Sequence, residues 1–505
     1  MTLPDWLDPV YEAAEMRACD SWAIEDQAVA SLDLMESAGI GLARTVAAHA
    51  RSGPIRVVIG KGNNGGDGLV AARILREDGH AVDVLSVAPV EELVGDPLAN
   101  LERLPGEPPR PFEAGFLDGS GAVVDALLGT GFSGEPREPT AGAIRAINGQ
   151  GAPVVACDVP SGVDASTGEV HGDAVHAGAT ATFHGSKIGL HVEPGKTCAG
   201  EVEVIAIGIP RGAPAPTAAG LISERVLELV PRRERDGSKF SSGVVAIVGG
   251  SHGLTGAPTM AAFAAQRTGA GYVQVAVPRS VELVFELKLL EAMTHALPEE
   301  DGAHVPAGVA RVEELAERAG AIALGPGIGR SEGALEFARE VARRVTVPLL
   351  IDADGLNAHA GRLELLADRP GPTVLTPHAG ELGRLLGVES KEVAAHRLAH
   401  AREAAERSGC VVVLKGDDSL VAAPGGPVAI SPGASPALAT AGTGDVLSGV
   451  IATFMAKGLG AFEAASAGVF AHARAGKVAA ARHGADHTVA GDVIEALPEA
   501  LRAGA

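Results

Sequence analysis

Aromatic residues are scarce in this chain of 505 residues, because Phe, Trp and Tyr together make up only 3% of it. The hydrophobic fraction is still 46%, so the core has to be packed mainly from Val, Leu, Ile and Ala. Basic residues are outnumbered as well, with 41 Lys and Arg against 63 Asp and Glu and a formal net charge of −22. This balance argues against a nucleic-acid partner, which binds to a basic surface.

Clustered cysteines and long apolar runs are also missing. The cysteines are scattered along the chain, at Cys19, Cys157, Cys198 and Cys410. We therefore expect neither a disulfide framework nor a zinc site, and a cytoplasmic location. The N-terminus has no basic segment followed by an apolar one, so no signal peptide is expected. No apolar run approaches the roughly 20 residues that a membrane-spanning helix needs, and no membrane partner is expected.

Strand-like apolar runs alternate with helix-like segments in both halves of the chain. This alternation predicts an α/β architecture with parallel, doubly wound sheets. The chain is too long for one ordinary core, so two or more domains are expected. The Pro-, Gly- and Ala-rich segment 210–216 is the best linker candidate, which places one domain over residues 1–212 and a second over residues 221–505.

The expected strands carry polar residues or glycines where several of them end. In such sheets, ligands bind beyond the carboxyl ends of the strands, so these residues should converge. In the first half we expect a helical region over 10–50, helices at 69–77 and 143–148, and strands at 55–59, 81–86, 122–125 and 153–158. In the second half we expect strands at 244–248, 273–277, 321–324, 349–351, 373–375 and 410–414.

Two glycine–aspartate loops are the most informative segments. Gly60–Gly68 follows the apolar run 55–59, and Gly442–Asp445 precedes the apolar run 446–451. Glycines let the backbone approach a ligand closely, and N–H groups at a helix N-terminus favour a phosphate. Because the two loops differ in sequence and context, we expect two unlike nucleotide-handling sites in one polypeptide.

Two further elements accompany the first loop. Asp125 ends a strand and is followed by a second glycine loop, Gly129–Gly134. Asp158 and Ser161 flank Pro160, which cannot donate to a sheet and so ends its strand. Carboxylate and amide oxygens are hard ligands suited to a monovalent or divalent cation. A strand-end Asp alone is more often a turn former, but three such elements in order favour a site.

Together these residues resemble the NAD(P)H-hydrate epimerase family. The resemblance runs from Met16-Arg17, through Leu34–Gly39, to about Gly208, and includes Lys187 in Gly185–Leu190. It implies a Rossmann-like three-layer domain that interconverts the two C6 epimers of hydrated NADH and NADPH. It implies that potassium is held by Asn64, Asp125 and Ser161, and that the substrate is lined by Asn63, Asn64, Gly65, Gly66, Asp67, Gly129, Thr130, Gly131, Phe132, Ser133, Gly134 and Glu135.

Asp158 is the expected acid/base catalyst of this first site. An aspartate with a pKa near 3.9 is a weak acid at neutral pH, so burial would have to raise the pKa of Asp158. Lys187 is a second catalytic candidate, and the alternative reading is a surface or phosphate-contacting lysine.

The second loop has the composition of a phosphoryl-transfer site. Backbone N–H groups of Gly442–Gly444 would hold an anion, and Asp445 would take a proton from an attacking hydroxyl. With the motifs Gly249–Ser251, Gly325–Gly329, Asp352–Asn357 and Thr376–Leu382, it resembles the ADP-dependent NAD(P)H-hydrate dehydratases of ribokinase-like fold, over about Ser223 to Leu501.

This second resemblance also implies site residues. Asp445 would be catalytic, and the hydrated nucleotide would touch Ala257, Gly327, His378 and Asp445. ADP would touch Lys415, Gly416, Asp417, Asp418, Ser419 and Gly444. Asp352 and Asp354 would support either magnesium or the loop. The chain departs from the family pattern at Gly355, at Ser419 and in the segment 434–438.

The sequence therefore predicts a bifunctional repair enzyme for damaged nicotinamide cofactors. Its substrates would be NADHX and NADPHX, its co-substrate ADP and its ions K⁺ and Mg²⁺, and we expect a homo-oligomer. Two alternatives stay open. One is a vitamin or sugar kinase with a regulatory N-terminal domain, because ribokinase-like kinases share the Gly–Asp loop. The other makes the first half a binding module without catalysis.

Overall fold

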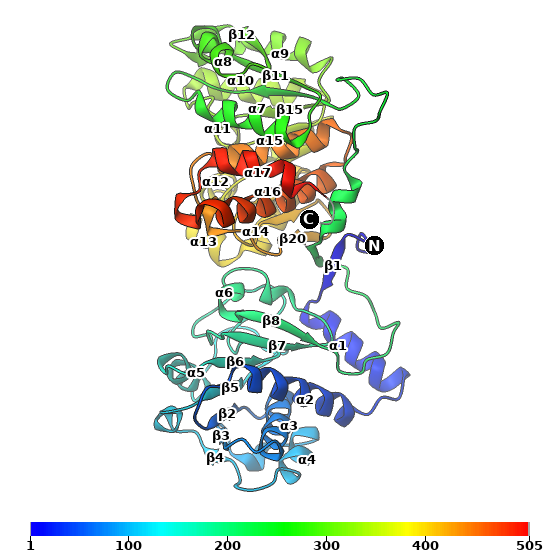
Figure 1. The fold of residues 1–505 in the computed structure, drawn as a ribbon, viewed down its shortest axis with the longest axis vertical. Coiled ribbons are helices and arrows are strands. Elements are labelled where there is room, and N and C mark those ends of the chain that lie inside the picture. Colours follow the sequence, from blue (N-terminus) through cyan, green and yellow to red (C-terminus); the bar gives the residue numbers. More distant parts are fainter. Residues whose placement is uncertain (1, 503–505) are drawn as a thin grey trace. The chain divides into compact units, whose positions relative to one another are not determined.

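The computed structural model describes residues 2–502, and their elements are shown in Figure 1. The chain divides into two compact units. One contains Pro9–Ala219, and the other contains Pro4–Asp8 and the chain from Gly220 onward. The short segment Pro4–Asp8 joins the second unit because β1 (Leu7–Val10) is the edge strand of that unit's sheet.

The first unit is built on a seven-stranded sheet in which every pair of neighbouring strands is parallel. In spatial order the strands are β4 (Arg110–Pro111), β3 (Val82–Ser86), β2 (Ile55–Ile59), β5 (Ala122–Ala126), β6 (Val154–Cys157), β7 (Ala179–Phe183) and β8 (Glu201–Ile205). The helices are α1 (Ala13–Ser21), α2 (Ser31–His49), α3 (Asn63–Glu77), α4 (Asp96–Glu102), α5 (Thr140–Gly149) and α6 (Gly195–Ala199).

Helices cover both faces of this sheet. Neighbouring strand residues belong to different cores, as Val57 packs with α2 and α3 whereas Val58 packs with α5. Successive side chains of a strand point to opposite faces, so a strand buried on both sides reads as a continuous apolar run. The three-layer α/β prediction is confirmed for this unit.

The strand order reverses between β2 and β5, which are neighbours in the sheet. The chain leaves β2 toward β3 on one side and returns to β5 on the other. This is the topological switch point, where parallel α/β sheets bind ligands at the carboxyl ends of the strands. The first Gly–Asp segment lies directly after β2, and Leu127–Phe132 lies directly after β5.

The second unit is built on an eleven-stranded sheet of mixed direction. Its order is β1, β9 (Ala219–Ile222), β20 (Val428–Ile430), β19 (Leu420–Ala422), β18 (Val411–Leu414), β17 (Thr373–Leu375), β16 (Leu349–Ile351), β15 (Ala321–Leu324), β10 (Val244–Val248), β11 (Tyr272–Pro278) and β12 (Met293–Leu297). Strands β10 and β15 to β18 are parallel neighbours, so their carboxyl ends share one edge. Strand β19 runs antiparallel to both of its neighbours, β18 and β20.

Helices of the second unit lie between its strands along the chain and after the last of them. They are α7 (Gly256–Thr268), α8 (Glu282–Lys288), α9 (Val309–Ala316), α10 (Glu332–Arg344), α11 (Asp354–Asn357), α12 (Ala379–Leu386), α13 (Ser390–Ala395), α14 (Arg397–Ser408), α15 (Thr443–Ala456), α16 (Ala461–His483) and α17 (Ala490–Ala500). A short hairpin joins β13 (Glu299–Glu300) to β14 (Ala303–His304). Among residues 2–502, no helix is long and apolar enough to cross a membrane.

The expected strands are confirmed almost to the residue, but the first helix boundary was wrong. We expected a helix from 69, whereas α3 begins at Asn63. The glycines that suggested a loop are helical positions in close contact with neighbours. A Cβ on Gly65 would lie 2.1 Å from the carbonyl oxygen of Gly60, and one on Gly66 would lie 2.6 Å from the sulfur of Met35.

We expect Gly65→Ala to destabilise the first unit by about 1–3 kcal/mol, since the added methyl would displace backbone rather than a flexible side chain. Gly149→Ala is the matched control, because Gly149 is also helical and a Cβ there meets nothing within 4 Å. Thermal and urea unfolding of both variants would test this. Equal stability of the two would contradict the close-contact role of Gly65.

Candidate active sites

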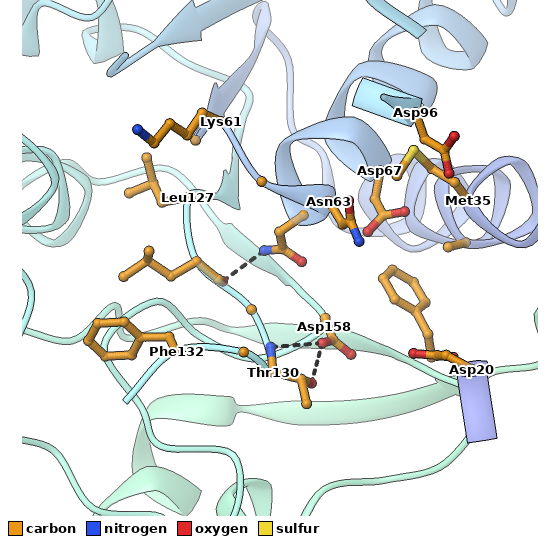
Figure 2. Close-up of a pocket in the computed structure, with 18 of the residues that line it drawn as sticks. Asp20, Met35, Lys61, Asn63, Asp67, Asp96, Leu127, Thr130, Phe132 and Asp158 are labelled. Atoms are coloured by element: carbon orange, nitrogen blue, oxygen red, sulfur yellow. Dashed lines mark hydrogen bonds between the residues drawn. The ribbon is translucent and has the colours of Figure 1, made fainter. Parts of the chain in front are cut away.

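A cavity of about 890 Å³ lies at the switch point of the first unit. Figure 2 shows side chains from several elements reaching into it, among them Asp20, Asp67 and Asp158. The cavity therefore lies at the carboxyl ends of β2, β5 and β6, the edge expected from the sequence. Its lining includes Gly60, Lys61, Gly62, Asn63, Asn64, Asp67, Leu127–Phe132, Asp158 and Lys187, with Met16, Asp20 and Met35 from α1 and α2.

Most of the expected substrate residues line this cavity, but not all of them do. Asn63, Asn64, Asp67 and the run 129–132 do so. Gly65 and Gly66 instead allow α3 to pack closely. Ser133, Gly134 and Glu135 lie on an exposed loop and do not line the cavity.

A buried ion pair forms the floor of the first site. The Nζ of Lys187 donates to the Oδ1 of Asp158 at 2.6 Å, to the hydroxyl of Thr182 at 2.9 Å and to the carbonyl of Phe183 at 2.9 Å. Thr130 donates to the other carboxylate oxygen from its hydroxyl at 2.5 Å and its backbone N–H at 3.2 Å. Lys187 is only 1% exposed, which excludes the surface-lysine alternative.

The charge state of Asp158 differs from what acid catalysis needs. Burial by itself would raise the pKa of this carboxyl. The charge of Lys187 and the hydrogen bonds from Lys187 and Thr130 outweigh burial, and the pKa of Asp158 is lowered. Asp158 is therefore an ionised carboxylate at neutral pH, and the expectation of a raised pKa is wrong. Its backbone has a φ of +67°, which is uncommon for a residue other than Gly.

Asn64, Asp125 and Ser161 form a second polar cluster beside the cavity. Ser161 donates to the Asp125 carboxylate from its hydroxyl at 2.6 Å and its backbone N–H at 2.8 Å. Asn64 donates to the carbonyls of Leu128 and Cys157, at 2.8 and 3.0 Å. The side chains offer only oxygen ligands with one carboxylate among them, and burial raises the pKa of Asp125 to about 6. This donor set consists of the oxygen ligands that hard cations prefer.

Two residues of the first site were missed by the sequence reasoning. Thr182 contacts both members of the ion pair, and Asp20 lines the cavity from α1. Burial raises the pKa of Asp20, with Asp158 adding to the rise and Lys187 opposing it. Asp20 could have been found, because it lies one helical turn after Met16 and residues four apart share a helix face.

In the second unit, the shared edge of the sheet brings the expected motifs together. Gly249 follows β10, Gly325 follows β15, Asp352 follows β16, Thr376 follows β17 and Lys415 follows β18. Gly327 has a φ of +67°, and a Cβ there would lie 2.6 Å from the carbonyl oxygen of Leu254. Ala257 lies in the first turn of α7, and the Gly–Asp loop leads into α15 as expected.

A cavity of about 340 Å³ lies beside the Gly–Asp loop of this unit. Of the expected nucleotide residues, Lys415, Gly416, Asp417, Ser419 and Gly444 line it. Asp418 does not, because it is fully buried and pairs with Arg397 at 2.7 Å. The segment that departs from the family pattern also lines the cavity, through Ala434, Ser435, Pro436 and Leu438.

Lys415 lies at the centre of the acidic groups of this site. Its Nζ lies 3.0 Å from a carboxylate oxygen of Asp352 and 3.6 Å from one of Glu381. Ser448 donates to the second oxygen of Asp352 at 2.7 Å. Burial raises the pKa of Asp445 to about 7, and Asp352 adds to the rise while Lys415 opposes it. Asp445 therefore titrates near neutrality in the first turn of α15.

His378 and Asp354 have structural contacts of their own. The Nδ1 of His378 accepts from the backbone N–H groups of Gly380 and Glu381, so the residue caps α12. Its ring is half-exposed, so the other edge can still meet a ligand. Asp354 pairs with Arg330 at 2.9 Å, whereas Asp352 contacts Lys415 and Ser448. Among residues 2–502, no group of three His, Cys, Asp or Glu side chains is arranged as a metal site.

Comparisons with known proteins agree with this geometry. A family model described as NAD(P)H-hydrate dehydratase matches residues 245–499, and one described as YjeF-related protein N-terminus matches residues 31–189. Bifunctional NAD(P)H-hydrate repair enzymes of Salinibacter ruber and Moorella thermoacetica are 42% and 40% identical over 97% of this chain, and over 95% and 96% of their own lengths. A Bacillus subtilis ADP/ATP-dependent NAD(P)H-hydrate dehydratase structure, 29% identical, covers 55% of this chain and 95% of its own, with a TM-score of 0.48.

We expect Lys187→Met to destabilise the first unit by about 3–5 kcal/mol at neutral pH, because it leaves the Asp158 carboxylate buried without its counter-charge. The double variant Lys187→Met/Asp158→Asn should recover part of this loss. The pKa of Asp158 is lowered in the folded chain, so the pair's contribution is present above the ordinary Asp pKa of about 3.9 and is lost as pH falls through the lowered value. Urea unfolding of the wild type, the single variant and the double variant across pH would measure the contribution of the pair to stability. A double variant as unstable as Lys187→Met would contradict the stabilising role of the pair.

Proposed function

Since the chain belongs to the family of bifunctional NAD(P)H-hydrate repair enzymes, we propose which unit carries each reaction and which side chains do the chemistry. The protein is an NAD(P)H-hydrate epimerase and a nucleotide-dependent NAD(P)H-hydrate dehydratase. We assign the epimerase to residues 1–212 and the dehydratase to residues 221–505. Two cavities of different chemistry support this division, one around the Asp158–Lys187 pair and one around Lys415 and the Gly–Asp loop.

In the epimerase, the hydrated nicotinamide ring would occupy the cavity beside Asp158. The C6 hydroxyl is next to the ring nitrogen, so its loss leaves a cationic ring that the nitrogen lone pair stabilises. An ionised Asp158 stabilises that charge and takes the proton from the water that re-adds. Lys187 has all three of its protons committed to Asp158, Thr182 and Phe183, so it holds Asp158 in place and in its charged form.

Potassium is part of this proposal. Asn64, Asp125 and Ser161 would hold it, and the ion would supply positive charge beside the loop 127–131 where the substrate lies. The all-oxygen donor set with a single carboxylate supports this choice over a divalent ion.

In the dehydratase, ADP is the proposed phosphoryl donor. Its adenosine would enter the 340 Å³ cavity against Leu438, Leu447 and Val469, and its phosphates would face Lys415 and the N-terminus of α15. A helix N-terminus favours anions through its free N–H groups and dipole. Magnesium would accompany the nucleotide phosphates, since Mg²⁺ is commonly bound by one or two carboxylates together with the phosphates.

Asp445 is the proposed base of this second reaction. It removes the proton of the C6 hydroxyl as that oxygen attacks the terminal phosphorus of ADP, which releases AMP. Phosphate then leaves with a proton from the neighbouring ring carbon, and the dihydropyridine of NAD(P)H is restored. Ala257, Gly327 and His378 would hold the ring, since their strand ends lie along the same edge. The observation that best supports the assignment is the pKa of Asp445, about 7, beside Lys415.

We predict that Asp445→Asn abolishes recovery of NAD(P)H while epimerisation continues. Asp158→Asn should abolish epimerisation while recovery of NAD(P)H continues. Both substitutions keep the shape of the side chain and remove its charge. The assay follows reduced-nicotinamide absorbance for dehydration and chromatographic separation of the epimers for epimerisation, with ADP and ATP compared side by side. A stable phosphorylated product in place of NAD(P)H would favour a kinase and overturn the dehydratase mechanism.

The pH dependence of dehydration should follow the ionisation of Asp445. Because the base form is needed and its pKa is about 7, kcat should rise with pH through about 7 and then level off. The kcat of epimerisation, measured without ADP, should not show this rise with pH. A dehydration rate that is flat between about pH 6 and pH 8 would contradict Asp445 as the base.

A further inference from the structure

The first cavity holds more carboxyl groups than its buried lysine can neutralise. Asp158, Asp67 and Asp20 all line it, and Lys187 is the buried ammonium among them. Asp158 takes the hydrogen bonds of Lys187 and Thr130, as described above. Asp67 is 8% exposed, and among residues 2–502 its carboxyl group has no hydrogen bond or ion pair. Figure 2 shows Asp67 pointing from α3 into the cavity that Asp158 enters from the end of β6.

We propose that Asp67 is the general acid of the epimerase, giving its proton to the C6 hydroxyl of the hydrated nicotinamide ring. This role rests on the epimerase function proposed above and adds a catalytic group to it. A general acid needs a proton that is not already committed to the protein, and it needs access to the substrate. Asp67 meets both conditions, because its carboxyl group faces the cavity and has no hydrogen-bond or ion-pair partner among the described residues 2–502.

Two neighbouring groups, Lys187 and Asp158, are less suited to this task. The three protons of the Lys187 ammonium go to Asp158, Thr182 and Phe183, so none points at the substrate. Asp158 is ionised by that lysine and has no proton to give. The pKa of Asp67 is raised well above its ordinary value by burial first and by Asp158 and Asp20 in addition, against the opposing effect of Lys187. The environment thus makes Asp67 suited to act as an acid and Asp158 suited to act as a base.

The proposed step balances in protons and electron pairs. The ring nitrogen lone pair forms a double bond to C6 as the C6–O bond breaks, and the Asp67 proton passes to the departing oxygen, which leaves as water. A water molecule then adds to C6 from the opposite face, and the electron pair of the C–N double bond returns to nitrogen. The proton of that water goes to Asp158. Exchange with solvent returns both carboxyl groups to their starting states.

Burial, Asp158, Asp20 and Lys187 set the ionisation of Asp67, and further charged groups line the same cavity. The negative groups are Asp20 on α1, Glu92, Asp96 on α4 and Asp158, and the neutral thiol of Cys157 lies behind them. The positive groups are Arg17, Lys61, which pairs with Glu92 at 3.0 Å, and Lys187. The acidic groups outnumber the basic ones here, which favours a carboxyl group that keeps its proton.

The test is the variant Asp67→Asn in the full chain, with a purified R epimer of hydrated NADH and no ADP, so that only epimerisation is measured. We expect kcat to fall by about 10²-fold or more, the range of general acid catalysis, with KM within about threefold. Asp67→Glu should restore part of the rate. Asp78→Asn is the matched control, since Asp78 is exposed at the other end of α3, and it should keep the wild-type rate.

Two further readouts separate catalysis from a structural role. Asp67→Asn should leave the melting temperature unchanged or higher, because it removes a buried carboxyl group without a partner. In the wild type, kcat should fall as the pH rises and Asp67 loses its proton. In Asp67→Asn, kcat should not show this fall with rising pH. A variant that epimerises at the wild-type rate, or whose lost rate is matched by lost stability, would overturn the role of Asp67. A wild-type chain that does not accelerate epimerisation at all would overturn the proposed function itself.

Discussion

Both sites depend on one electrostatic constraint: each has a single mostly buried lysine surrounded by a larger number of carboxyl groups. In the first unit Lys187 pairs with Asp158, and among residues 2–502 Asp67 has no ion pair of its own. In the second unit Lys415 lies between Asp352 and Glu381, and the pKa of Asp445 rises to about 7. Because a buried carboxylate without a partner is costly, the surplus carboxyl group keeps its proton at a pH where an exposed one would lose it.

This constraint explains how two unlike reactions share a similar set of residues. The first unit keeps one carboxyl group protonated and another ionised, a division suited to exchanging water at a ring carbon. The second unit holds its titrating aspartate in the first turn of a helix, where anion-binding N–H groups and Lys415 lie close by. A carboxyl group that titrates near neutral pH at this position is suited to removing the proton of a hydroxyl during phosphoryl transfer.

The parallel sheets bring these groups together. Asp125 lies near the carboxyl end of β5 and Asp158 follows the neighbouring β6, while Asp352, Thr376 and Lys415 follow three successive strands of the second sheet. Apolar runs of Val, Ile, Leu and Ala form these strands because both faces of each sheet are covered by helices. The scarcity of aromatic residues suits this architecture, since small aliphatic side chains allow glycine-bearing helices such as α3 to approach the strands closely.

The sequence by itself determined the α/β class and the positions of those strands that lead into the motifs, because a strand buried on both faces is visible as a short apolar run; strands such as β7, β8, β19 and β20 were not predicted. It also identified Asp158, Lys187 and Asp445 through their motifs. Only the tertiary structure decided the charge states of those groups. The pKa of Asp158 is lowered because Lys187, 29 positions further along the chain, lies 2.6 Å away. The fold also brings Asp20 on α1 into the cavity, and it leaves the Asp67 carboxyl group without a hydrogen bond or ion pair within the described range 2–502. Charge states depend on distances between residues remote in sequence, and those distances exist only once the chain is folded.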